Sequence, residues 1–445
     1  MKQEAVAANV RVDFTTHRVQ TSPLSLGSCI STYADGGSNL IKGPQRDLLR
    51  GYLADLGPLV WRIPLYHHDG QVGSSAGGVH GGNEGAQYIT AIRGINGTPM
   101  IAVGGSTNDN DIRASDAAAL VRYFNDGGGK NGGPVDYFII GNEPDNGFGM
   151  SNYIQGGAGN DGFNNIVGAM RSASSRRLYI AGPSLVTWAD YKFSSYQEFF
   201  SAAAPNVDII DFHKYGDGER YDNLLRTSQY ADAVRWFQGQ LPTYFGSRSG
   251  SIAIQAGEFN YHPYYNGWND VFYTSRNLVH TASVIGQLLR EGARAYQYAD
   301  NNGPLGLITD GTGNNGQPSG QFVRLPTYWG LAAWTGGTWF RRYGQWMVEG
   351  TTTLPEFEVF ATDESKKVLL LNKSATANRV AELELVGAAS GVYSVWNFPS
   401  GMDPADFTNG PQFKPPVPGA QSQPFSGGRV QVDVPAMSVV VLFID

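Results

Sequence analysis

The chain has 445 residues, of which 16% are charged and 12% aromatic, and its formal net charge at pH 7 is −7. This length exceeds that of one typical domain and accommodates a large domain with a smaller companion. The negative charge gives no electrostatic reason to expect nucleic acid or an anionic membrane as a partner, and no run approaches the ~20 apolar residues of a membrane span.

Cysteine usage and the amino end bear on the cellular compartment. Cys29 is the single cysteine, so the chain forms no internal disulfide, and a cysteine-based metal site is not expected. The amino end, residues 1–12, lacks the apolar core of a signal peptide. Because glycine and tyrosine are abundant and charges are sparse, the composition favours a secreted or periplasmic protein whose signal has been removed. A cytoplasmic location stays open.

The first predicted element is a half-buried strand at residues 8–14, where apolar and polar side chains alternate. One face carries Val10, Val12 and Phe14. No neighbouring segment offers a partner strand. We therefore expect residues 1–18 to join a sheet formed farther along the chain.

From about residue 25 the order strand, loop, helix repeats, which is typical of a parallel α/β fold. The first helix is expected at 43–57 and the last at 326–340. The eight predicted strands are 26–33, 59–66, 99–105, 136–144, 178–184, 207–216, 251–262 and 293–301. Eight such units predict a closed (β/α)₈ barrel, the TIM-barrel fold, over residues 19–345, with long glycine-rich loops at its functional face.

After about residue 345 the spacing of apolar residues changes to two, which is typical of antiparallel strands. Strands are predicted at 366–371, 381–386, 391–396, 429–434 and 438–444. We therefore expect residues 346–445 to form an antiparallel β-sandwich, and the amino-terminal strand to join it.

A glutamate follows the fourth predicted barrel strand. The apolar residues 137–140 lead into a turn that contains Gly141, Asn142, Glu143 and Pro144. Gly141 permits the bend, and Pro144 is expected to hold Glu143 in an extended backbone. The tips of barrel strands are where barrel enzymes carry their chemistry. An ordinary strand-end glutamate in a salt bridge is the alternative.

Glu258 has the same setting after the seventh strand, where an apolar run and Gly257 precede it. Two strand-end glutamates three strands apart face one another across the mouth of an eight-stranded barrel. This arrangement suits glycoside hydrolysis, in which one carboxyl group donates a proton and the other is the nucleophile, about 5–5.5 Å apart in retaining enzymes. The pKa of the acid is expected to be raised by burial and by its negative neighbour, while donors keep the nucleophile ionised.

The order of these motifs resembles that of clan A glycoside hydrolases. The barrel with an amino-terminal strand and a sandwich is similar to families 39 and 79 of that clan, and also to families 30 and 51. The resemblance implies that Glu143 is the acid/base, that Glu258 is the nucleophile, and that Asn142 hydrogen-bonds the 2-hydroxyl group of the sugar.

Further positions of the chain match the same resemblance. His213 and Tyr215, after the sixth strand, are similar to the clan's His-x-Tyr, whose tyrosine donates to the nucleophile. Arg62, in the second strand, resembles an arginine that supports the nucleophile electrostatically.

Further substrate contacts are expected from the same face of the barrel. Trp188, after the fifth strand, and Trp268, after the seventh, offer flat rings that stack on sugars, although aromatic residues equally serve as core fillers. His67, after the second strand, is another candidate, with an exposed loop position as the alternative. The eighth strand lacks the tryptophan that many clan members place at its end, and Gln297 there is included among the substrate-binding candidates.

The sequence therefore predicts a retaining glycoside hydrolase that cleaves a β-linked glycoside or polysaccharide without a metal or an organic cofactor. A carbohydrate-binding protein on an inactive barrel is one alternative. A metal-dependent barrel hydrolase is another, which would use the run His67-His68-Asp69 together with His213 and Glu258, although the first strand has no His-x-His. The sugar, the choice between endo and exo cleavage, and the oligomeric state stay open.

Overall fold

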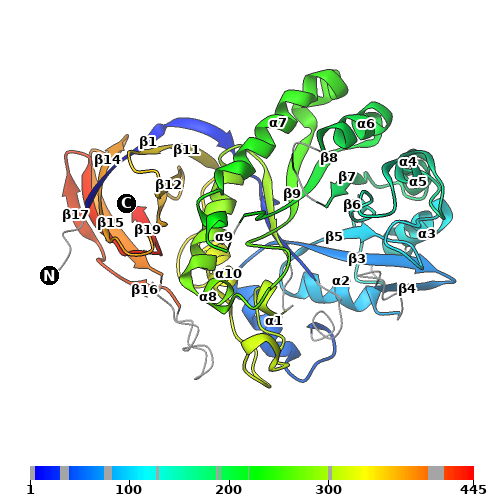
Figure 1. The fold of residues 1–445 in the computed structure, drawn as a ribbon, viewed down its shortest axis with the longest axis horizontal. Coiled ribbons are helices and arrows are strands. Elements are labelled where there is room, and N and C mark those ends of the chain that lie inside the picture. The colour runs from blue at the N-terminus through cyan, green and yellow to red at the C-terminus, as the bar shows by residue number, and fades with distance from the viewer. Residues whose placement is uncertain are drawn as a thin grey trace.

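A computed structural model of the chain describes residues 6–30, 40–74, 83–126, 130–186, 189, 192–218, 220–298, 303–398 and 415–445. In these residues a helix-covered parallel barrel lies beside an antiparallel sheet (Figure 1). Among them, no helix is both long enough and apolar enough to cross a membrane.

The parallel sheet closes on itself, which confirms the predicted eight-stranded barrel. The first barrel strand pairs in parallel with both the second and the last, so no edge strand remains in the ring. The barrel strands are β2 (Leu26–Cys29), β3 (Val60–His68), β5 (Thr98–Val103), β6 (Tyr137–Ile140), β7 (Tyr179–Leu185), β8 (Ile209–Tyr215), β9 (Ala253–Asn260) and β10 (Arg294–Gln297). One strand that the sequence does not announce, β4 (Gln71–Ser74), forms an antiparallel hairpin with β3.

Helices cover the outside of the barrel (Figure 1). They are α1 (Arg46–Asp55), α2 (Gly85–Gly94), α3 (Ala114–Asn125), α4 (Met150–Gln155), α5 (Phe163–Ser172), α6 (Phe193–Ala203), α7 (Ser228–Phe245), α8 (Asn269–Phe272), α9 (Ser275–Leu289) and α10 (Pro326–Thr335). The described residues also include the short 3₁₀ turns η4 (Ala204–Asn206), η5 (Asp222–Leu224), η6 (Gly246–Ser251), η7 (Gly303–Leu305) and η8 (Asn314–Gly316). The last helix ends five residues earlier than the predicted 340, because Gly336 adopts a left-handed conformation (φ 79°) that stops it.

Side chains alternate between the two faces of each barrel strand, as the strand period requires. One set points outward and packs under the helices. The other fills the barrel interior with a small apolar cluster, which contains Val60, Met100, Ala102, Ile139, Ala181, Ile209 and Tyr296. Polar side chains take over on the inward face nearer the carboxyl ends of the strands, for example Arg62 on β3 and His213 on β8.

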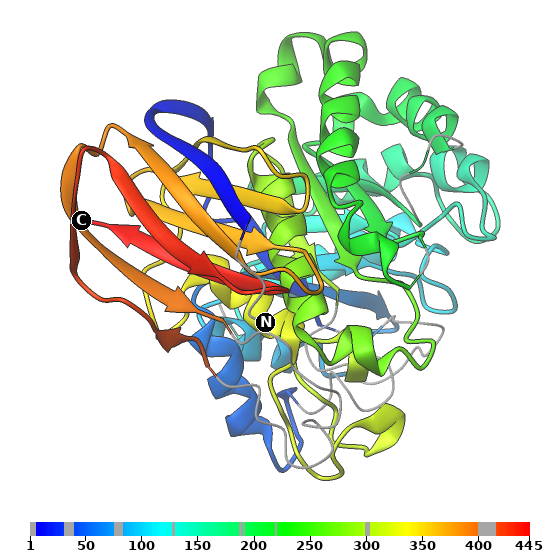
Figure 2. The ribbon, with the colours of Figure 1, turned by 60° about the vertical axis from the view of Figure 1, so that its left-hand side comes forward.

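The carboxyl-terminal strands and the first strand form one ten-stranded sheet, as predicted (Figure 2). Its strands are β1 (Val6–Gln20), β11 (Trp346–Thr352), β12 (Phe357–Thr362), β13 (Lys367–Asn372), β14 (Arg379–Val386), β15 (Ser390–Asn397), β16 (Val417–Pro418), β17 (Gln423–Ser426), β18 (Arg429–Val434) and β19 (Ser438–Ile444). Strand β1 lies inside this sheet, antiparallel to β11 and parallel to β14. Its Val10, Val12 and Phe14 are buried in a core that the other strands share, so the predicted alternation is confirmed.

Polar contacts as well as apolar packing join the sheet to the barrel. Glu358 on β12 accepts hydrogen bonds from Ser283 and from Gln287 (2.9 Å), both on α9. Lys373, after β13, lies 2.7 Å from the same carboxylate and donates to Thr227 (2.6 Å). The side chain of Lys373 is only 3% exposed, so this ion pair is shielded from water.

Substitution Lys373→Met should destabilise the fold, because it leaves the Glu358 carboxylate buried without its cation. Removing one partner of a buried pair costs about 3 kcal/mol or more. Urea unfolding would measure the loss. The matched control is Arg18→Met, which breaks the more exposed pair between Arg18 and Glu349 and should cost under about 1 kcal/mol. Equal losses in the two variants would show that the Lys373–Glu358 pair contributes no more to stability than the more exposed pair does.

Candidate active site

The turn after β6 presents Asn142 and Glu143 at the carboxyl end of the barrel. Gly141 begins it with φ 72°, and a Cβ atom there would lie 2.3 Å from the Asn110 side-chain oxygen, so only glycine fits. Asn110 grips the turn from the neighbouring loop: its Nδ2 donates to the Asn142 carbonyl (2.6 Å), and its Oδ1 accepts from the Asn142 N–H (3.0 Å). The position of the turn is therefore set by a tertiary contact.

The backbone of Glu143 differs from the sequence expectation. Its φ is 45°, in the left-handed region, whereas Pro144 was expected to hold it extended. Such a conformation costs a residue with a side chain about 1–2 kcal/mol. Two backbone hydrogen bonds hold it: the Glu143 N–H donates to the Ser184 carbonyl (3.0 Å), and the Glu143 carbonyl accepts from the Asn146 N–H (2.9 Å).

A bulge in β9 aims Glu258 into the barrel. In a regular strand Glu258 would share the outward face of Ala256, which packs under the helices. The register between β8 and β9 shifts so that Phe212 pairs with Ala256 and His213 with Glu258, which leaves Gly257 unpaired. A Cβ on Gly257 would lie 2.1 Å from a carboxylate oxygen of Asp211, so the bulge requires glycine.

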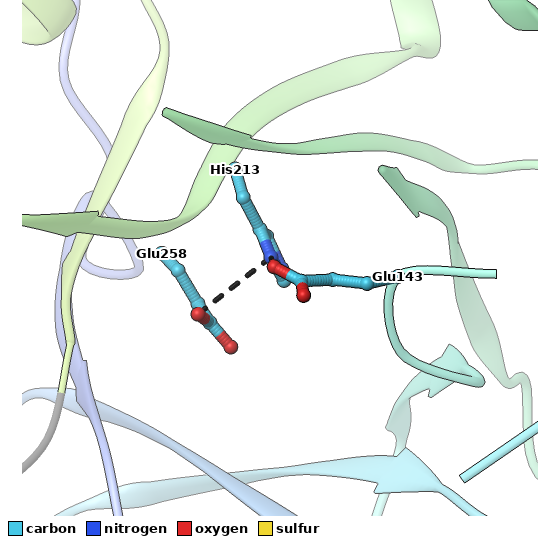
Figure 3. A group of neighbouring side chains, drawn as sticks. All are labelled: Glu143, His213 and Glu258. Carbon is cyan, nitrogen blue, oxygen red and sulfur yellow. Dashed lines mark hydrogen bonds and ion pairs between the residues drawn. The ribbon is translucent and has the colours of Figure 1, made fainter. Parts of the chain in front are cut away.

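The two glutamates converge on one histidine (Figure 3). The His213 Nδ1 atom lies 2.8 Å from a Glu143 oxygen and 3.6 Å from a Glu258 oxygen, and one ligand atom from each of the three residues falls within 4.8 Å of the others. The Arg62 guanidinium donates to one oxygen of Glu258, and the Tyr215 hydroxyl donates to the other. Both oxygens of Glu258 are thus satisfied by donors.

Arg62 also links the two halves of the site. Its Nη1 bonds Glu258 on β9, and its Nη2 donates to the Asn142 side-chain oxygen after β6. Since Arg62 itself stands on β3 and is buried, one guanidinium fixes three strand ends relative to each other.

The pKa values of the two carboxyl groups move in opposite directions. Burial raises the pKa of Glu143 above its usual range, and His213 offsets this only in part. Burial acts the same way on Glu258, but the charges of His213 and Arg62 and the hydrogen bond from Tyr215 outweigh it and lower its pKa. Glu143 therefore keeps its proton to higher pH than Glu258 does.

The pKa of His213 depends on the same two carboxyl groups. Burial alone would lower its pKa, but the Glu258 charge and the hydrogen bond to Glu143 outweigh burial and raise it. A protonated imidazole between two carboxyl groups reduces their mutual repulsion.

Sequence reasoning missed Asp211, a carboxyl group buried below the site. It accepts a hydrogen bond from Ser184 and another from the Gln255 amide (2.8 Å), and burial raises its pKa. The two-residue period of a strand would have indicated it. Asp211, His213 and Tyr215 occupy every second position of β8 and so share one face.

Three of the other predicted contacts lie in the described residues, and none of these three has a hydrogen bond or an ion pair to this group. His67 lies on the same, outward side of β3 as Leu65. It is half-buried, and its buried Nδ1 atom has no hydrogen-bond partner in the described residues. Gln297 is fully buried, and neither its amide nitrogen nor its oxygen has a partner there. Trp268 packs on the core, 4.9 Å from the ring of His262. Trp188 falls outside the described residues.

Among the described residues, one group has ligand atoms close enough together to hold a metal ion, and it consists of Glu143, His213 and Glu258. A cation there would share Glu258 with Arg62 and lie close to a second positive group, His213. This charge pattern suits a protein-bound carboxylate pair better than a metal site.

No family model and no curated protein sequence matches the chain. Solved structures do. A family 51 arabinofuranosidase from Xanthomonas axonopodis pv. citri matches with a TM-score of 0.74 at 16% identity, over 99% of this chain and 100% of that one. The α-L-arabinofuranosidase of Thermotoga maritima matches with 0.75 at 14% identity, over 98% and 100%. A family 44 xyloglucanase of Paenibacillus polymyxa matches with 0.66 at 12% identity, over 99% and 100%.

At these identities the likeness establishes the fold. The chain has the TIM-barrel fold with an added β-sheet that these glycoside hydrolases share over essentially their whole length. The predicted barrel with an added sheet is thereby confirmed, and the resemblance to clan A glycoside hydrolases, with families 39 and 79, stays a prediction.

Substitution Gly257→Ala should lower the melting temperature and disturb the site, because the added methyl group would meet the Asp211 carboxylate. Overpacking of this kind costs about 1–3 kcal/mol. The control is Gly239→Ala on α7, where nothing lies within 4 Å of the added carbon and where alanine should stabilise the helix by about 0.5–1 kcal/mol. A Gly257→Ala protein as stable as the wild type would contradict the bulge assignment.

Proposed function

We propose that the chain is a retaining glycoside hydrolase, with Glu143 as the acid/base and Glu258 as the nucleophile. The supporting observation is the carboxyl pair itself: oxygens of the two groups approach within 4.8 Å, and their pKa values are shifted in opposite directions. This spacing suits the about 5–5.5 Å of retaining enzymes and leaves no room for the water that an inverting pair holds at about 6.5–9.5 Å.

In the first step the ionised Glu258 attacks the anomeric carbon of a bound sugar. The bond from that carbon to the leaving oxygen breaks while Glu143 donates its proton to this oxygen, so the alcohol departs neutral. The sugar is left as an ester on Glu258. The raised pKa of Glu143 and the lowered pKa of Glu258 prepare the two groups for these roles.

In the second step Glu143, now ionised, removes a proton from a water molecule. The resulting oxygen attacks the anomeric carbon, the ester bond to Glu258 breaks, and both carboxyl groups return to their starting states. Because each step inverts the anomeric carbon, the product keeps the original configuration.

The neighbours of Glu258 would govern its reactivity. Arg62 and Tyr215 stabilise its negative charge before attack, and both donors keep its oxygens oriented. Asn142, held by Arg62 and Asn110, stands beside the acid, where it would hydrogen-bond the 2-hydroxyl group of the sugar.

The fold supports a carbohydrate substrate but leaves the linkage to experiment. We propose a β-linked glycoside, as the sequence resemblance implies. The similar structures include α-L-arabinofuranosidases and a xyloglucanase, so arabinofuranosides and xyloglucan belong in the substrate panel with β-glycosides. A carbohydrate-binding protein without activity would not require the opposite pKa shifts of the two carboxyl groups.

Substitution Glu258→Ala should reduce hydrolysis to background on every substrate, because no nucleophile remains. Glu143→Ala should slow glycosides with poor leaving groups by about 10²–10⁴-fold. Aryl glycosides with good leaving groups should partly escape the second defect, since they need little protonation. Steady-state rates on a panel of aryl glycosides and polysaccharides measure both effects.

A 2-deoxy-2-fluoroglycoside should label the wild-type protein at Glu258, as peptide mass spectrometry would show. The matched control is Glu198→Ala, an exposed glutamate on α6, which should behave as the wild type. A protein that binds sugars, hydrolyses none of the panel and stays unlabelled would be a carbohydrate-binding protein, and the proposal would fail.

The pH profile of kcat/KM should be bell-shaped, because activity needs an ionised Glu258 and a protonated Glu143. The acid limb reports the lowered pKa of Glu258 and the alkaline limb the raised pKa of Glu143. Tyr215→Phe removes a donor to the Glu258 carboxylate, so its pKa should rise and the acid limb should move to higher pH. An acid limb that stays in place would show that Tyr215 does not tune the nucleophile.

A further inference from the structure

Two tyrosines flank the strand of the proposed nucleophile. Tyr215 is the last residue of β8 and pairs with Asn260 of β9. Tyr298 directly follows β10, and its N–H donates to the Phe259 carbonyl (3.0 Å). Because Glu258 comes just before Phe259 and Asn260 in the chain, both tyrosines lie close to it, one on each side of its strand.

The rings of these two tyrosines meet across β9. Neighbouring strands lie about 4.8 Å apart, so β8 and β10, with β9 between them, are separated by about 10 Å. The ring centroids of Tyr215 and Tyr298 are nevertheless 6.0 Å apart, at an interplanar angle of 77°. The rings therefore lean toward each other over β9. They do so on the side that carries the Glu258 carboxylate, because the Tyr215 hydroxyl donates to it.

The bulge at Gly257 brings the two rings to the same level. On one side of β9 the pairing passes from Ala256 with Ala295 to Phe259 with Gln297, so three steps on β9 match two steps on β10. The ladder with β8 shifts at the same place. The extra residue that turns Glu258 into the barrel thus also moves both tyrosines one residue farther along β9.

The contact between the rings restrains the Tyr215 hydroxyl. A phenolic hydroxyl moves with its ring, so a ring that turns to another rotamer carries the hydroxyl away from its acceptor. Aromatic pairs favour an edge-to-face arrangement with centroids about 4.5–7 Å apart, which is the arrangement of Tyr215 and Tyr298. The Tyr298 ring therefore opposes movement of Tyr215 away from Glu258.

We propose that Tyr298 is a positioning residue, whose ring holds the Tyr215 hydroxyl on the Glu258 carboxylate and so helps to keep that carboxylate ionised. Tyr298 acts through Tyr215 and takes no part as an acid or a base. The inference rests on the proposed function for its effect on catalysis, whereas the contacts from Tyr298 to Tyr215 and on to Glu258 do not depend on a substrate.

Several other groups also act on Glu258 or its turn, and a substitution at Tyr298 leaves all of them unchanged. They are Arg62 on β3, Glu143 after β6, His213 on β8, Asp211 on β8 against Gly257, and Cys29 on β2, which donates to the Gly257 carbonyl (3.3 Å).

The experiment follows the ionisation of Glu258 in two ways, by ¹³C NMR titration of its carboxyl group and by the acid limb of the kcat/KM profile. The signal is assigned by its loss in Glu258→Gln. Tyr298→Ala should move the titration and the acid limb to higher pH by about 0.5–1 pH unit, because the Tyr215 hydroxyl is no longer held. Tyr298→Phe keeps the ring and should leave both where the wild type has them.

A double variant shows whether Tyr298 acts through Tyr215. Tyr215→Phe lacks the hydroxyl that Tyr298 positions, so adding Tyr298→Ala to it should cause no further shift. The control is Tyr264→Ala, a tyrosine that is 68% exposed after β9, which should leave the titration of Glu258 unchanged. Melting curves show which variants fold, and Tyr298→Leu, which fills more of the space, replaces Tyr298→Ala if that protein unfolds.

Two results would overturn the inference. One is a titration of Glu258 that stays in place in the folded Ala or Leu variant, and the other is a full shift from Tyr298→Ala when the Tyr215 hydroxyl is already absent. The NMR titration requires no turnover, so it separates the inference from the proposed function. A protein that hydrolyses no glycoside but shows the expected shifts would support the role of Tyr298 and refute the hydrolase proposal.

Discussion

The site depends on neighbouring donors and charges that offset the burial and mutual repulsion of two carboxyl groups in one buried space. Ionised carboxylates lose hydration on burial and repel each other, so neither Glu143 nor Glu258 would be stable there alone. The compensation is uneven: Arg62 and Tyr215 both donate to Glu258, whereas Glu143 receives its contact from His213. This asymmetry keeps Glu258 ionised to lower pH than Glu143, and it arises from side chains on β3 and β8.

The backbone holds the two carboxyl groups in place through two local irregularities. Glu143 adopts a left-handed conformation, and the bulge at Gly257 removes one residue from the ladder between β8 and β9. The turn that holds Glu143 follows β6, whereas the bulge at Gly257 lies inside β9, with three paired residues beyond it. Asn110, in a neighbouring loop, restrains the first turn by hydrogen bonds, and Asp211, on β8, lies against Gly257.

The sheet is joined to the barrel by the path of the chain and by polar contacts between side chains. Because β1 lies between β11 and β14, the first strand and the last hundred residues must fold together. The largely buried Glu358 then ties this sheet to α9, which lies between β9, the strand of the proposed nucleophile, and β10 in the chain.

The sequence by itself determined the order of the elements, since periods of two and 3.6 and the glycines at strand ends are local properties. It also indicated Glu143 and Glu258, because each follows an apolar strand and a turn residue. Tertiary structure alone decided which way these side chains point: strand alternation would send Glu258 outward, and the conformation of Glu143 follows from a hydrogen bond to Ser184 on β7. The hydrogen bonds that satisfy the buried Asp211 carboxyl group are likewise a property of packing. Whether a polar atom finds a partner depends on residues far away in the chain, and no local pattern records that distance.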